Sequence, residues 1–298
     1  MSNSIEYPTN KVETKERGKN VKIVLKFIRH GERTKEGQLT DYGRKITAIC
    51  AKESGIKPED FDAVKAIGST AGPKGPGGLQ RSLESADIYA HEIAGDGALE
   101  TRGSDVLDYE NLKSPAHFDH TTVYNSFLPP DFEKLSDEEK AKAAKYAQRQ
   151  MLERYFSDKT PEGEAATNEV AGSFAYIIDW YIKMTKRLES GSEVLMPAGT
   201  HGGTMEFLLQ KALVYKDRDG VEHTGFELLD AINGEFDPSE AFNVTIETDD
   251  KGGLKEIKVT FDNAARPQGD MHLDLSKLDE ARKYYLELHP EHRKYEGL

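Results

Sequence analysis

Two histidines, each following an apolar stretch and preceding glycine, are the residues of this sequence best suited to chemistry. His30 stands in VKIVLKFIRHGER, residues 21–33, and His201 stands in THGG, residues 200–203. A neutral imidazole can attack a phosphorus atom as a nucleophile. Glycine beside it lets an anion approach the backbone closely. We therefore interpret the two histidines as parts of one site.

Three arginines could complete such a site. Arg29 and Arg33 flank His30 along the chain, and Arg81 opens a predicted helix after the glycine- and proline-rich loop AGPKGPGG. The planar fork of a guanidinium matches the oxygens of a phosphate, and the amides at a helix start also favour an anion. Positive charges nearby disfavour the imidazolium form of His30. Together these residues predict a small cationic pocket that binds phosphate and keeps His30 neutral.

The elements that position these residues can be predicted from apolar periodicity and capping signals. Alternation of apolar side chains over residues 21–28 indicates a buried strand that ends at the histidine. Further strands are expected at residues 63–69, 193–199, 242–246 and 257–261, and helices at 41–54, from 81 onward, at 136–156, 166–188, 205–213 and 276–288. Strands alternating with helices predict an α/β sandwich with a mostly parallel sheet. Ligands of such sheets bind at the carboxyl ends of the strands, where the histidines lie.

Composition narrows the classes of function. The formal net charge of -13 argues against broad binding to nucleic acid or to an anionic membrane. No apolar stretch approaches the roughly 20 residues of a membrane span, the first residues lack a signal-peptide core, and the only cysteine, Cys50, allows no internal disulfide. A cytoplasmic location is the expectation. Residues 1–20 are predicted to form a disordered tail before a single domain, residues 21–298.

Five motifs in order carry a resemblance to the histidine phosphatase superfamily, whose fold is phosphoglycerate mutase-like. They are RHG at 29–31, LTDYG at 39–43, RSLESA at 81–86, PEGE at 161–164 and THGG at 200–203. The resemblance covers residues 21 to about 262. It implies a three-layer αβα sandwich and a reaction that needs no metal or other cofactor.

The resemblance also implies roles for individual residues. His30 would be the phosphorylated nucleophile, while Arg29, Arg81 and His201 would hold the phosphoryl group. A carboxylic acid would protonate the leaving oxygen, and both Glu110 and Asp108 are candidates for it. Arg33 is a further phosphate-binding candidate, because one branch of the superfamily keeps an arginine there. The segment at about 111–160 would shape the substrate pocket, which makes Lys113 and His117 candidate substrate contacts.

Three functions remain open at this point. A phosphatase acting on a small phosphomonoester is favoured, because the mutase's run of arginine, histidine and tyrosine after its acid has no counterpart in YENLKSPAHFDH, residues 109–120. A phosphoglycerate mutase and a non-catalytic phosphate-binding regulatory module are the alternatives. The presence of both histidines argues against the last.

Overall fold

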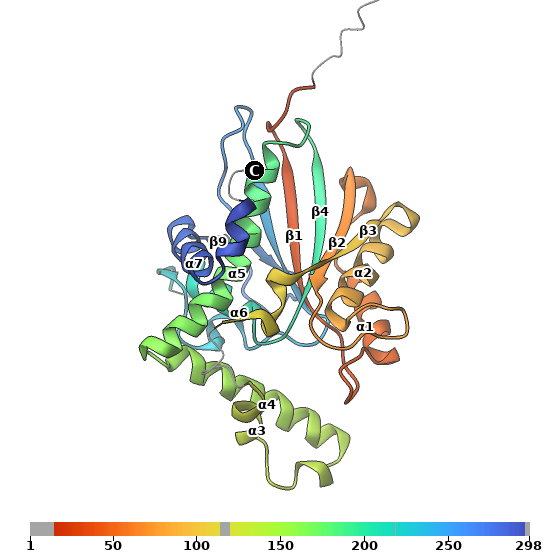
Figure 1. Cartoon of the computed structure of the whole chain (residues 1–298), viewed down its shortest axis with the longest axis vertical. Coiled ribbons are helices and arrows are strands. Elements are labelled where there is room, and N and C mark those ends of the chain that lie inside the picture. The colour runs from red at the N-terminus through yellow and green to blue at the C-terminus, as the bar shows by residue number, and fades with distance from the viewer. Residues whose placement is uncertain (1–14, 114–119, 218, 296–298) are drawn as a thin grey trace, which may run out of the picture.

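A sheet between two layers of helices forms the body of the protein (Figure 1). The structure, a computed structural model, describes residues 15–113, 120–217 and 219–295. Its described strands are β1 Lys22–Arg29, β2 Ala63–Ser69, β3 Leu99–Ser104, β4 Glu193–Thr200, β5 Leu213–Lys216, β6 Glu222–Thr224, β7 Ala241–Glu247, β8 Lys258–Phe261 and β9 His272–Leu273. They lie in the order β3-β2-β4-β1-β7-β8-β9-β5-β6. The α/β class expected from the sequence is confirmed.

The sheet has one parallel and one antiparallel half. Strands β3, β2, β4 and β1 pair in parallel, because helices carry the chain from one to the next. From β7 onward the described pairs are antiparallel, beginning with β1 against β7 and the hairpin-linked pair of β7 and β8. The sheet is therefore partly parallel, and the expectation of a mostly parallel sheet was wrong for the half built from hairpins and short strands.

Alternation along β1 explains the layers. Ile23, Leu25 and Phe27 face a core shared with the helices α5 Pro161–Thr185, α6 Met205–Ala212 and α7 Leu275–Leu288. Val24 and Ile28 face a second core shared with α1 Asp41–Glu53 and α2 Arg81–Ala94. A strand buried on both faces reads as a nearly continuous apolar run, which is the pattern of this segment.

Two further helices, α3 His120–Ser126 and α4 Asp137–Ser157, lie together beyond the carboxyl ends of β1 and β4, at the lower end of Figure 1. The predicted capping box of α4 is present, because Ser136 accepts from the amide of Glu139 and Glu139 accepts from the amide of Ser136. We call α3 and α4 the cap. None of the helices within the described ranges combines the length and the apolar character that crossing a membrane requires.

The chain termini and one helix boundary differ from the sequence-based expectation. Residues 1–14 of the tail predicted over residues 1–20 lie outside the described residues. In the rest of this segment, the backbone of Arg17 forms an antiparallel β-bridge with that of Glu189, and the amide of Gly18 donates to the carbonyl of Leu188. The helix expected at 166–188 begins at Pro161 instead. Thr160 caps it by accepting from the amide of Gly163, and proline suits a first turn, where its missing N–H costs no hydrogen bond.

Replacement of Gly172 by alanine should destabilise the fold. Gly172 lies where α5 meets α7, and an added Cβ would overlap the carbonyl oxygen of Ala281 and lie 2.7 Å from Cβ of Tyr285. Overpacking of this kind costs about 1–3 kcal/mol. Urea unfolding of Gly172→Ala should show this loss in the free energy of unfolding. Gly97→Ala, with open space around the new methyl group, is the control, and equal effects of both changes would contradict the packing of α5 on α7.

Candidate active site

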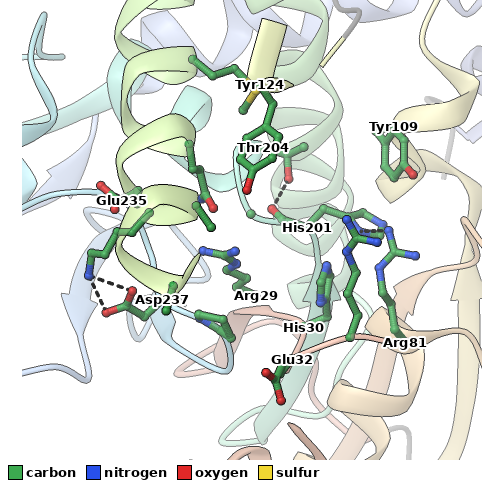
Figure 2. Close-up of a pocket in the computed structure, with 18 of the residues that line it drawn as sticks. Arg29, His30, Glu32, Arg81, Tyr109, Tyr124, His201, Thr204, Glu235 and Asp237 are labelled. Carbon is green, nitrogen blue, oxygen red and sulfur yellow. Dashed lines mark hydrogen bonds and ion pairs between the residues drawn. The ribbon is translucent and has the colours of Figure 1, made fainter. Parts of the chain in front are cut away.

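The register between β1 and β4 brings the two histidines together. Arg29 pairs with Thr200, so the next residue of each strand is a histidine, and the amide of His30 donates to the carbonyl of Thr200 at 3.0 Å. The centroids of the two imidazole rings lie 5.3 Å apart. Both rings are buried, and both line a cavity of about 680 Å³ under the cap (Figure 2). The predicted common site is present in the structure as an arrangement of residues.

The geometry around His30 leaves one ring nitrogen free to act as a nucleophile. Nδ1 lies 2.7 Å from the carbonyl oxygen of Gly31, a contact in which the ring must donate. A neutral ring then carries its lone pair on Nε2. Burial, followed by the charge of Arg81 and those of Arg29 and Arg33, lowers the pKa of His30 well below its usual value. His30 is therefore neutral at physiological pH, as the sequence predicted.

Three arginines line the same cavity as His30, as the expected cationic pocket requires. They are Arg29, Arg33 and Arg81. Nη2 of Arg81 lies 3.2 Å from Nδ1 of His201, and Nη1 of Arg29 donates to the carbonyl of Phe236. Arg81 lines the cavity even though the glycine- and proline-rich loop separates it from the end of β2. Guanidinium groups in such a cavity have the charge and the paired donors that could bind a phosphate dianion.

Two glycines explain why the motifs carry glycine after each histidine. A Cβ on Gly202 would overlap Nε of Arg29 and lie 2.7 Å from its Cζ, so the arginine lies directly against the backbone there. A Cβ on Gly31 would lie 2.8 Å from the carbonyl oxygen of Gly43, where α1 crosses the strand end. The absence of a side chain thus lets Arg29 and α1 approach the histidines.

The carboxylate of Asp108 orients His201 and does not face a leaving group. It accepts hydrogen bonds from the hydroxyls of Ser69 and Thr70 and from the amides of Thr70 and Ala71, at 2.5 to 3.1 Å. Ser69 in turn lies 2.9 Å from Nε2 of His201. Asp108 does not line the cavity, so the structure does not bring this expected acid to the leaving-group side.

Two of the other residues expected on the leaving-group side, Glu110 and Lys113, do not line the cavity. Glu110 is exposed and does not line it. The ammonium of Lys113 donates to the carbonyl of Leu288 and pairs with Glu291, which fixes the lysine to the C-terminal segment. His117 lies outside the described residues. The sequence-based choice of Glu110 and Lys113 was misplaced, because the chain turns away after Tyr109, whose ring packs against His201.

Other residues of the cavity were missed by the sequence analysis. Helix α4 of the cap contributes Lys145 and Gln148, and the loop before β7 contributes Glu235 and Asp237. The loop reads NGEFDPSE, residues 233–240, and has turn residues and three acidic residues just before a strand. That composition marks an ordered loop at a sheet edge and was the available signal. The cap residues lie on an ordinary amphipathic helix and gave none.

Comparisons with known proteins gave structural likenesses alone. Neither a scan against protein-family models nor a search of the curated proteins found a match. The similar solved structures include a phytase from Klebsiella sp. ASR1, with 10% identity, a TM-score of 0.45 and coverage of 91% of this chain and 96% of that chain. A mycobacterial glucosyl-3-phosphoglycerate phosphatase in complex with inorganic phosphate has 13% identity, a TM-score of 0.41 and coverage of 82% and 99%. The native structure of that phosphatase has 12% identity, a TM-score of 0.38 and coverage of 81% of this chain and 97% of that chain. Each TM-score is below 0.5, so a function must rest on the residues of this site.

Gly202→Ala should weaken the binding of phosphate. The new methyl group would displace the guanidinium of Arg29 from the cavity wall. Loss of a charge-assisted contact of this kind costs about 1.5–3 kcal/mol, so the dissociation constant for inorganic phosphate should rise about tenfold or more. Isothermal titration calorimetry measures this. Gly77→Ala, which meets nothing within 4 Å, should leave the constant unchanged. Unaltered binding by Gly202→Ala would show that Arg29 takes no part.

The lowered pKa of His30 predicts its titration. Because the folded-state pKa lies below the ordinary value of 6.5, the ring stays neutral as the pH falls through 6.5 and gains its proton only well below it. Proton NMR of the imidazole C–H signals, assigned with a His30→Gln variant, should show this. Arg81→Gln removes one of the charges that lower the pKa, and should shift the midpoint upward. A midpoint near 6.5 in the unaltered protein would contradict the described environment.

Proposed function

We propose that this chain is a phosphatase of the histidine phosphatase superfamily, which hydrolyses a small phosphomonoester through a phosphohistidine on His30. The observation that carries the proposal is a buried neutral imidazole whose Nδ1 lies 2.7 Å from the Gly31 carbonyl oxygen, in a cavity that three arginines and His201 also line. Phosphoryl transfer needs in-line positioning and stabilisation of charge more than elaborate covalent machinery. Both are available here from the chain's own residues.

The reaction would proceed in two displacements. In the first, the lone pair of His30 Nε2 attacks phosphorus, the N–P bond forms, and the P–O ester bond breaks with its electrons on the leaving oxygen. A carboxylic acid in the cavity gives that oxygen a proton. In the second, water attacks the phosphorus, its proton returns to the same carboxylate, and the N–P bond breaks to release inorganic phosphate. Arg29, Arg81 and His201 stabilise the transferring group in both steps.

The proton donor belongs among carboxylates that line the cavity. Glu32, Glu235 and Asp237 do so among the described residues, whereas Asp108 and Glu110 do not. Of these three, Glu32 and Asp237 are the proposed donors. Glu32 follows the catalytic tripeptide directly and accepts from the hydroxyl of Thr40. Asp237 pairs with the ammonium of Lys145 at 2.9 Å. The proposed acid therefore moves from the segment that follows β3 to the other walls of the cavity.

Removal of the nucleophile should abolish turnover and the covalent intermediate together. For His30→Ala we expect hydrolysis of 4-nitrophenyl phosphate to fall by about 10³-fold or more, since loss of a nucleophile removes the covalent route. Quenching the unaltered enzyme with labelled substrate should trap an acid-labile phosphoprotein, and the variant should give none.

Glu110→Gln serves as the matched control, because Glu110 is exposed and lies outside the cavity. It should retain the turnover of the unaltered enzyme. Circular dichroism would establish that His30→Ala keeps the fold. Phosphate release by a folded His30→Ala protein at the original rate would refute the proposed mechanism, and an unaltered protein that binds phosphate without releasing it from any ester would identify a binding module.

A further inference from the structure

Glu235 is a buried carboxylate in the cavity without a partner for one oxygen. Its residue is 4% exposed, and Oε1 has no hydrogen-bond partner among the described residues. Figure 2 places Glu235 and Asp237 on the side of Arg29 away from Arg81, in the half of the cavity that the phosphate-binding groups leave free. A buried acceptor without a donor is unfavourable, so the position is costly unless a ligand supplies the donor.

The backbone around Glu235 is held in place by a second buried arginine. Arg266 donates to the carbonyls of Ile232, Gly234 and Glu235, pairs with Glu240, and lies 4.0 Å over the ring of Phe236. The residue before Gly234, Asn233, has a left-handed backbone, with φ of 60°. This support fixes the main chain of the loop before any ligand arrives, which lowers the entropic cost of binding.

Gln148 of the cap is a buried hydrogen-bond donor for which the described residues provide no acceptor. Its Nε2 is buried and has no hydrogen-bond partner among the described residues, and the residue lines the same cavity. The cavity thus contains an unsatisfied acceptor on Glu235 and an unsatisfied donor on Gln148. A hydroxyl group can donate to one and accept from the other. An ammonium group has no acceptor, and a carboxylate or phosphate has no donor.

The two ends of the cavity also differ in the charge of the side chains that line them. Arg29, Arg33 and Arg81 line the phosphate end, whereas Glu235, whose charge acts on the Arg29 guanidinium, lines the other end. Asp237 forms an ion pair with Lys145. A second anionic group on the substrate would meet Glu235, and contact between like charges is unfavourable.

We infer that the end of the cavity formed by Glu235 and Gln148 is a subsite for a neutral, hydroxylated leaving group, and that the substrate is the monophosphate of a sugar or polyol. Glu235 accepts from a substrate hydroxyl, and Gln148 donates to one. This inference rests on the proposed phosphatase function and adds to it the class of leaving group. A phosphorylated hydroxy acid or a bisphosphate is selected against by the charge of Glu235.

A matched pair of substrates tests the inference. Glycerol 3-phosphate and 3-phosphoglycerate differ at one carbon, which carries a hydroxymethyl group in the first and a carboxylate in the second. The unaltered enzyme should show a kcat/KM at least about tenfold higher for glycerol 3-phosphate, the discrimination that one polar contact can supply. Phosphoethanolamine tests the ammonium alternative and should also be the poorer substrate.

Two variants assign the preference to the named residues. Glu235→Gln keeps the size of the side chain and removes its charge, so the preference over 3-phosphoglycerate should narrow about tenfold. Gln148→Met removes the donor and should raise KM for glycerol 3-phosphate. Glu227→Gln removes one charge at an exposed position outside the cavity and should leave the preference unchanged.

The outcomes separate this inference from the function on which it rests. Hydrolysis of 4-nitrophenyl phosphate together with equal or better use of 3-phosphoglycerate or phosphoethanolamine would overturn the subsite and leave the phosphatase function standing. A preference for glycerol 3-phosphate that Glu235→Gln leaves unaltered would likewise overturn it. Failure to hydrolyse every ester, 4-nitrophenyl phosphate included, would overturn both proposals.

Discussion

The parallel pairing of β1 with β4 is the constraint on which the candidate site depends. The eight paired positions from Lys22 to Arg29 keep the strands in one register, and a slip by one residue would turn each strand's side chains to the opposite face of the sheet. Because both cores need the observed alternation, hydrophobic burial fixes the register, and the register places His30 beside His201. The energy that positions the histidines thus comes mainly from residues that take no part in chemistry.

Hydrogen bonds between polar groups then connect the side chains that the strands bring together. A chain of contacts runs from Asp108 through Ser69 to His201 and on to Arg81, so the residues that follow three neighbouring strands are tied into one network. Burial alone would leave His201 free to rotate. The four donors on Asp108 fix the start of the network, and its role is that of a positioning residue.

The two walls of the cavity differ in how they are built. The wall with the histidines belongs to the sheet, whereas the other consists of the cap and the loop that Arg266 supports (Figure 2). Loops and appended helices tolerate change better than central strands, because fewer buried contacts depend on them.

The sequence by itself determined the strand that ends at His30, the capped starts of α1 and α4, and the group of His30, Arg29, Arg81 and His201, because local periodicity, capping residues and short motifs carry these signals. It misplaced the leaving-group side, choosing Glu110 and Lys113. Only the tertiary structure turned the segment after β3 away from the cavity and brought Glu235 and Gln148 to it. These two residues are 87 positions apart in the chain and line one cavity only because of long-range packing, which no local pattern encodes.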